Sequence, residues 1–330
     1  MRASTLKVTL KALYKVARSV VITGAPGGGK TTIVHETANE LDVHYLERHM
    51  PTMLVEDFGI PVLSGEFLTY KIPDWFPAKG SKWDDGRGGI LCFDDRNQCT
   101  PDLQKVLANI MQARNLHGVP MADGWMVVST GNRQADRAGA NRVLTHLSNR
   151  ETELELETHL DDWTSWAIDH EVRMEVVSFL RFRPNLLHDF DPQRNQNPTP
   201  RSWVDGVSQT LGLVPPEAEY EVFKGAVGEG AAAEFTGFMR IFRKLPNPDT
   251  VLMHPDTSDV PSDPATLYAL TGALAQRAGK GNMERLVKYL TRVPKEFSVL
   301  CISQAVRRDA ELAETKAFVE WSVGNQDVLW

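Results

Sequence analysis

The stretch Gly24-Ala-Pro-Gly-Gly-Gly-Lys30-Thr31 decides the fold of this chain. It fits the pattern G-x-x-x-x-G-K-S/T, follows a short β-branched run at residues 19–23, and opens a segment of helical periodicity at residues 30–41. Glycines permit positive φ and a close approach of the backbone, so that consecutive N–H groups can converge on phosphate oxygens. The start of the helix adds the positive end of its dipole. The sequence therefore predicts a phosphate-binding loop between a buried strand and a helix.

This loop predicts a bound nucleotide, ATP, together with Mg²⁺. We expect Lys30 to reach the β- and γ-phosphates and Thr31 to offer its hydroxyl to Mg²⁺. An ordinary glycine-rich turn is the alternative, and the flanking strand and helix disfavour it. The predicted nucleotide-binding residues are Gly24, Ala25, Pro26, Gly27, Gly28, Gly29, Lys30, Thr31 and Thr32.

A second hydrophobic run, residues 90–93, ends in two carboxylates, Asp94 and Asp95. Beside a phosphate-binding loop, we expect Asp94 to hold the Mg²⁺ shell with Thr31, and Asp95 to accept a proton from an attacking water. The alternative is an acidic strand-to-loop turn, because Asp favours such places. Glu is commoner than Asp at the second position. The shorter side chain of Asp95 places the base differently, which bears on hydrolysis more than on binding.

Composition limits what the rest of the chain can be. Its 330 residues suggest about two domains, and a hydrophobic fraction of 42% excludes a wholly disordered protein. The 36 basic and 43 acidic residues give a net charge of −7, which disfavours nucleic acid as a general partner. Cys92, Cys99 and Cys301 are odd in number and form no C-x-x-C pair, so we expect no disulfide framework and a cytoplasmic location. No apolar run reaches the ~18 residues of a membrane span, so no membrane association is expected.

Strand-like and helical segments alternate over the first part of the chain. Besides residues 19–23, we expect strands at residues 43–46, 90–93 and 125–129, and a helix at residues 102–113. This alternation predicts a parallel sheet with crossover helices. After residue 160 the expected helices are residues 161–170, 171–180, 201–211, 217–227, 231–243, 265–278, 283–290 and 295–321. We predict an α/β domain over residues 1–160 and an all-helical domain over residues 161–330.

Several further stretches resemble the AAA+ ATPases, specifically the MoxR-like, dynein-related group in its bacterial or phage members. Residues 93–104, FDDRNQCTPDLQ, are similar to the family's D-E-x-N-x-A-x-P-x-x-Q segment, with Asp95 in place of Glu. Residues 125–132 resemble the sensor 1 strand, which ends in an Asn, and residues 199–203 resemble the start of the sensor 2 helix. The resemblance covers residues 15–215. It implies a P-loop NTPase sheet of the AAA+ type, followed by a helical lid with a C-terminal extension.

The resemblance also implies roles for single residues. Asn132 would orient the attacking water, and Arg201 would reach the γ-phosphate from the lid of the same subunit. Arg150 best matches the arginine finger, and Arg142 is a second candidate; such a cation would stabilise charge on the phosphoryl group held by a neighbouring subunit. Each has a simpler alternative: a turn residue for Asn132, and a solvent-exposed or salt-bridged side chain for the arginines.

The activity implied by this resemblance is Mg²⁺-dependent ATP hydrolysis that remodels a protein partner. An active site completed by a neighbour makes a head-to-tail interface, which closes into a ring, and the family usually forms hexamers. Members of the group often act beside a von Willebrand A-type protein. Two alternatives stay open. One is a nucleic-acid-stimulated motor or loader, which the acidic charge disfavours, and the other is a nucleotide-dependent assembly scaffold with weak hydrolysis, which Asp95 motivates.

Overall fold

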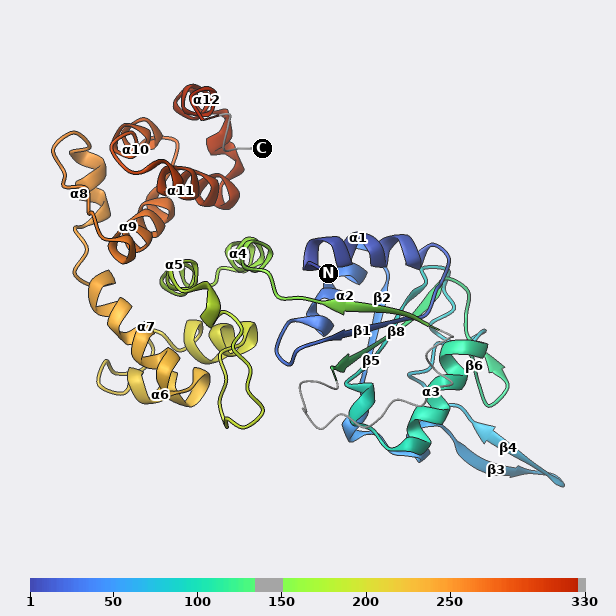
Figure 1. Cartoon of the computed structure of the whole chain (residues 1–330). Coiled ribbons are helices and arrows are strands. Elements are labelled where there is room, and N and C mark those ends of the chain that lie inside the picture. The colour runs from blue at the N-terminus through green and yellow to red at the C-terminus, as the bar shows by residue number, and fades with distance from the viewer. Residues whose placement is uncertain (134–150, 326–330) are drawn as a thin grey trace. The chain divides into compact units, whose positions relative to one another are not determined.

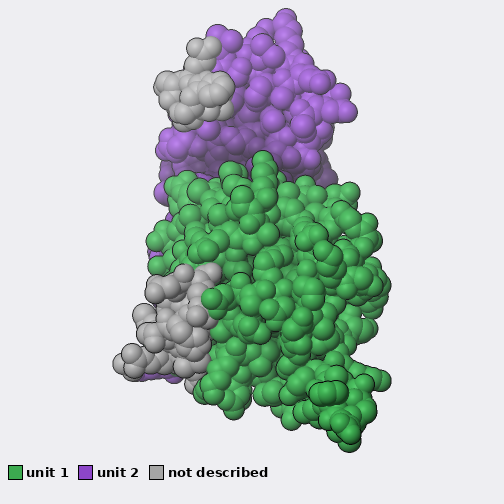
Figure 2. All heavy atoms as spheres, turned by 90° about the vertical axis from the view of Figure 1, so that its right-hand side faces the viewer, with its two compact units in different colours: residues 1–159, 190–192 green, residues 160–189, 193–330 purple. Residues whose placement is uncertain are grey.

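The computed structural model describes residues 1–133 and 151–325. The chain divides into two compact units (Figure 2). The N-terminal unit comprises Met1–His159 and Phe190–Pro192, and the C-terminal unit comprises Leu160–Asp189 and Gln193–Trp330. Among the helices that the structure describes, none combines the length and the apolar character needed to cross a bilayer.

A five-stranded parallel sheet forms the centre of the N-terminal unit (Figure 1). The strand order is β2-β5-β8-β1-β9, so the strand before the glycine-rich loop lies between two strands that come later in the chain. Every residue of β8 is buried, as are five of the six residues of β5, which is the pattern of parallel strands covered on both faces. The strands are β1 Val20–Gly24, β2 His44–His49, β5 Gly89–Asp94, β8 Trp125–Asn132 and β9 Thr152–Leu156.

Alternate residues of β5 enter two different cores. Ile90 and Cys92 pack in a cluster with residues of α1 Ala3–Tyr14 and α2 Lys30–Leu41. Leu91 and Phe93 pack in a second cluster with residues of α3 Pro101–Ala113. This alternation follows from the two-residue repeat of a strand, and it places α1 and α2 over one face of the sheet and α3 over the other.

Short elements complete the N-terminal unit. Between β2 and β5 the chain forms a hairpin whose tip carries exposed apolar side chains, among them Leu63 and Phe67. Figure 1 shows this hairpin extending away from the main sheet. The elements are η1 Met50–Thr52, η2 Val55–Phe58, β3 Ile60–Ser64, β4 Phe67–Lys71, η3 Arg96–Gln98, β6 Asn115–Leu116 and β7 Val119–Pro120.

The described part of the C-terminal unit is entirely helical and has two hydrophobic clusters. α9 Pro264–Arg277 contributes to both: Ala265 and Ala269 belong to one cluster, and Leu267 and Leu270 to the other. The remaining elements are α4 Leu160–Asp169, α5 Met174–Phe182, η5 Pro184–Leu186, η6 Ser202–Ser208, α6 Glu219–Val227, α7 Glu229–Phe242, α8 Pro248–Met253, α10 Met283–Leu290, α11 Lys295–Arg308, η7 Ala310–Glu314 and α12 Lys316–Val323.

The predicted fold class is confirmed: a parallel α/β sheet with crossover helices is followed by an all-helical part. Two of the expected helices differ from expectation. The helix expected at residues 295–321 is divided into α11, η7 and α12, because Asp309 and Thr315 each cap a new helical start. The segment expected to be a helix at residues 201–211 contains η6, which is a π-helix.

Candidate nucleotide-binding site

The glycine-rich loop joins the end of β1 to the start of α2. Gly27 and Gly29 have φ values of 71° and 87°, in the left-handed region that glycine adopts without a Cβ clash. At Gly24 a Cβ would lie 2.8 Å from the carbonyl oxygen of Leu156, so β9 passes close to the loop. α2 has no side-chain cap and no acidic residue in its own first turn, so its N-terminal N–H groups and dipole are directed at the loop. The predicted nucleotide-binding residues, 24–32, occupy the last residue of β1, the loop and the first turn of α2.

The side chain of Lys30 is buried against this loop. Its ammonium group donates hydrogen bonds to the carbonyl oxygens of Gly24 at 3.1 Å and Ala25 at 3.0 Å, and to Oδ1 of Asn132 at 2.9 Å. A buried cation needs such partners, and these three are neutral oxygens. The structure thus brings together two residues that are 102 positions apart in the chain, both predicted to act at the γ-phosphate.

Asp94 lies at the end of β5, between two hydroxyl groups. Its Oδ1 accepts a hydrogen bond from Thr130 at 2.6 Å and another from Thr31. Burial acts to raise the pKa of Asp94, but the hydrogen bonds from Thr130, Thr31 and His49 outweigh it and hold the pKa below its usual value. The carboxylate and the hydroxyl of Thr31 are hard oxygen donors, which is the donor set that Mg²⁺ prefers.

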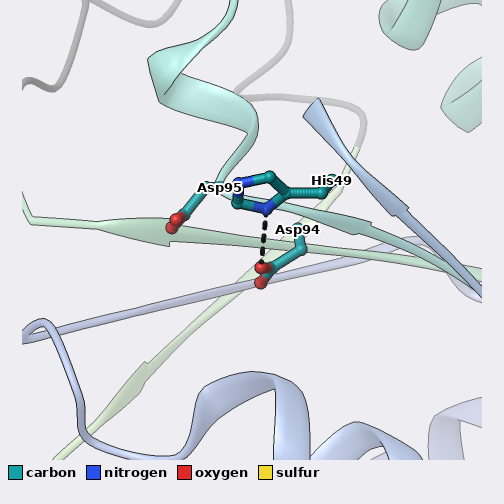
Figure 3. Close-up of side chains that lie close together, drawn as sticks. All are labelled: His49, Asp94 and Asp95. Atoms are coloured by element: carbon teal, nitrogen blue, oxygen red, sulfur yellow. Dashed lines mark hydrogen bonds and ion pairs between the residues drawn. The ribbon is translucent and has the colours of Figure 1, made fainter. Parts of the chain in front are cut away.

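Asp95 follows directly and adopts a left-handed conformation, with φ of 53°. Its backbone N–H donates to Oγ1 of Thr130 at 3.1 Å, so Thr130 links the backbone of Asp95 to the carboxylate of Asp94. The imidazole of His49 lies beside both carboxylates (Figure 3). Its Nδ1 is 3.3 Å from Oδ2 of Asp94. Sequence reasoning missed His49 and Thr130.

Asn132, the last residue of β8, is held by the side chain of Asn97. Nδ2 of Asn97 donates to the carbonyl oxygen of Asn132 at 2.6 Å, and the N–H of Asn132 donates to Oδ1 of Asn97 at 3.3 Å. Both side chains are buried. A Cβ at Gly131 would lie 3.0 Å from Oδ1 of Asn97, so this glycine allows the close approach. Asn97 therefore fixes the backbone that carries Asn132, and sequence reasoning gave it no role.

A buried ion pair lies next to these residues. The guanidinium of Arg96 donates to both carboxylate oxygens of Glu151, at 2.5 and 2.6 Å. The two side chains are 7% and 3% exposed. This bidentate pair joins η3, which follows Asp95, to the residue before β9.

Three arginines are also predicted to act at the nucleotide. Arg142 and Arg150 lie outside the described residues. Arg201 belongs to the C-terminal unit, where it is exposed and immediately precedes η6. Thr199 and Ser202 flank it and fix the local backbone, since the N–H of each donates a hydrogen bond to the side-chain hydroxyl oxygen of the other, at 2.9 and 3.1 Å.

The site thus consists of β1, the glycine-rich loop and α2, which begins with the buried Lys30, together with β5, which ends in the carboxylate of Asp94. These features define the class of P-loop α/β folds. No protein-family model matches the sequence, and no curated protein shows a significant match.

Solved structures resemble the chain at low sequence identity. A candidate ATPase from Cytophaga hutchinsonii is 13% identical with a TM-score of 0.37, over 98% of this chain and 89% of that one. NtrX from Brucella abortus, in complex with ATP, is 12% identical with a TM-score of 0.42, over 98% and 68% of the two chains. A RuvB variant from Thermotoga maritima is 14% identical with a TM-score of 0.38, over 82% and 79%. Likenesses this distant carry no functional argument.

Proposed function

We propose that this protein is a Mg²⁺-dependent ATPase of the AAA+, MoxR-like type. The observation that carries the proposal is the convergence of Lys30, Thr31, Asp94 and Asn132 at the end of the glycine-rich loop. These side chains are already joined by hydrogen bonds, so little reorganisation is needed to receive a triphosphate.

Each of these residues has a chemical task in the proposed reaction. The loop N–H groups and Lys30 would bind the phosphates, with phosphate oxygens replacing the carbonyl oxygens that Lys30 now contacts. Thr31 and Asp94 would hold Mg²⁺, which supplies positive charge to the phosphate oxygens when it is bound. Asp95 would accept the proton of the attacking water, and Asn132 would orient that water.

Steady-state phosphate release and binding of a fluorescent ATP analogue test this proposal. Lys30→Ala should weaken ATP binding about 10- to 100-fold, since a hydrogen bond to a charged group contributes about 1.5–3 kcal/mol, and should reduce turnover to background. Lys105→Ala is the matched control, because Lys105 is 64% exposed on α3 and pairs only with Asp102 among the ion pairs of the described residues. If the wild type releases no phosphate, the remaining alternative is the nucleotide-dependent assembly scaffold, which the short side chain of Asp95 favours.

We further propose that the active protein is a homo-oligomeric ring, in keeping with the resemblance to hexameric AAA+ proteins. In this ring Arg150, or failing it Arg142, would reach the nucleotide of the neighbouring subunit, and Arg201 would contact the γ-phosphate within its own subunit. The ring would remodel a protein partner, and a von Willebrand A-type protein would serve as the adaptor. The proposed location is the cytoplasm. Stimulation of phosphate release by DNA or RNA, and by no protein partner, would instead support the nucleic-acid motor.

A further inference from the structure

We propose that His49, Asp94 and Asp95 form a three-ligand site for a divalent transition-metal ion such as Mn²⁺. The proposal deepens the proposed function and rests on it at one residue, Asp94, which is also the proposed Mg²⁺ ligand. Metal binding by the three side chains does not itself require a nucleotide. Within residues 1–133 and 151–325, this is the one group of three or more His, Cys, Asp or Glu side chains with ligand atoms this close together.

The sheet register brings the three residues together. β2 and β5 pair in parallel, with His49 opposite Asp94 at the carboxyl ends of both strands. Asp95 comes next in the chain, and its left-handed backbone turns the chain out of the strand into η3. In Figure 3 the imidazole and both carboxylates gather at this one edge of the sheet. The ligands therefore sit on two adjacent strand ends, which are rigid supports.

The distances suit a single ion. Nδ1 of His49 and Oδ2 of Asp94 are 3.3 Å apart, and all three ligand atoms lie within 4.8 Å of one another. With metal–ligand bonds of about 2.1 Å, two neighbouring ligands stand about 3.0 Å apart in an octahedral site and about 3.4 Å apart in a tetrahedral one. Only a small movement of Asp95 is needed to complete the set.

The donor types select the kind of metal. Mg²⁺ prefers oxygen ligands and gives up its water reluctantly, whereas first-row transition metals accept imidazole nitrogen together with carboxylate oxygen. The side chain of His49 is 48% exposed and that of Asp94 is 17% exposed, so the ligands are open to solvent on one side and water can fill the remaining positions. One nitrogen and two carboxylate oxygens thus favour Mn²⁺ over Mg²⁺ in the absence of nucleotide.

Electron paramagnetic resonance of Mn²⁺ added to the full, nucleotide-free protein tests the site. We expect one bound Mn²⁺ whose spin-echo modulation shows a coupled ¹⁴N nucleus, the signature of imidazole coordination. His49→Ala should weaken Mn²⁺ binding on the order of tenfold or more and abolish the ¹⁴N modulation. His254→Ala removes an exposed imidazole from the C-terminal unit and should change neither measurement.

Three results separate this proposal from the proposed function. Lys30→Ala should weaken ATP binding and keep Mn²⁺ binding, because Lys30 is not among the ligands. The metal site alone would be overturned if the wild type hydrolyses ATP but binds no Mn²⁺ in the absence of nucleotide. It would also be overturned if a folded His49→Ala protein keeps the ¹⁴N modulation undiminished. Mn²⁺ bound through His49 in a protein that neither binds nor hydrolyses ATP would uphold the site and overturn the ATPase. Circular dichroism checks that each variant is folded.

Discussion

The hydrogen bond between Lys30 and Asn132 couples two steps of the proposed reaction. Nζ of Lys30 contacts Oδ1 of Asn132 at 2.9 Å, so the amide is occupied by the ammonium group in this state. In the proposed reaction Lys30 would turn to a phosphate oxygen and give up that contact, and the amide would become available to an attacking water. Asn97 keeps the backbone of Asn132 in place during this exchange, because it binds both the N–H and the carbonyl oxygen.

Replacing Asn97 should therefore affect turnover more than binding. In Asn97→Ala we expect kcat to fall about 10- to 100-fold, since small misplacements of a reacting group have effects of this size, with ATP affinity changed little. Phosphate-release kinetics and binding of a fluorescent ATP analogue measure the two quantities. Asn109→Ala, on the exposed face of α3, is the matched control. A raised KM with unchanged kcat would contradict the positioning role.

Sequence reasoning could predict the candidate residues whose signal is local. Lys30 and Thr31 stand in a motif of fixed spacing, and Asp94 stands at the end of an apolar run. His49 and Thr130 have no such signal, because their contacts with Asp94 arise from strand pairing across 45 and 36 residues. A polar residue at the end of a strand is informative only once the neighbouring strand is known.

The same limit applies to whole elements. β1, β5 and β8 are buried apolar runs and could be predicted, whereas β9 could not. Its sequence, TELEL, places Glu153 and Glu155 on alternate, exposed positions of an edge strand, so it lacks the apolar run of a central strand. The β3–β4 hairpin is missed for a related reason: its apolar side chains are exposed on both strands, so they show no one-sided pattern.

The contact between α5 and α9 gives an element-scale prediction. At Gly272 on α9, a Cβ would lie 2.1 Å from Oγ of Ser178 on α5, so these helices approach more closely than any larger residue allows. Gly272→Ala should lower the free energy of unfolding by about 1–3 kcal/mol, and adding Ser178→Ala should recover part of the loss. Chemical denaturation followed by circular dichroism measures both effects.

The matched control for this prediction is Gly237→Ala. Gly237 lies in α7 with no atom within 4 Å of a built Cβ, so the alanine should stabilise the helix by about 0.5–1 kcal/mol. Equal effects of the two substitutions would show that Gly272 matters for backbone freedom rather than for helix packing.

At the scale of the whole molecule, the chain is two units with separate cores. The sheet and the loop belong to the N-terminal unit, while Arg201 belongs to the C-terminal one. In the proposed ATPase, residues from both units and from a neighbouring subunit would serve one nucleotide. Length and composition suggest about two domains, but they do not say which of the proposed residues each unit carries.

Complementation between inactive variants tests the ring. Lys30→Ala subunits should bind ATP weakly and fail to hydrolyse it, and Arg150→Ala subunits should bind ATP without hydrolysing it, because the finger is supplied by a neighbour. Mixing the two should restore part of the phosphate release, since some Arg150→Ala subunits then receive Arg150 from an adjacent Lys30→Ala subunit. The same mixture made with Arg142→Ala examines the second candidate. A protein that stays monomeric by light scattering with a non-hydrolysable ATP analogue would rule out the ring.

The place of α9 in two hydrophobic clusters has a consequence for truncation within the C-terminal unit. One helix packs with α5 in one cluster and with α11 in the other, so its loss would remove apolar contacts from both. A shortened descendant that ended before Pro264 would expose the apolar surface of the helices that remained. Truncation before α9 should therefore destabilise the helices that remain, because the contacts of Ala265 and Ala269 in their cluster would be lost.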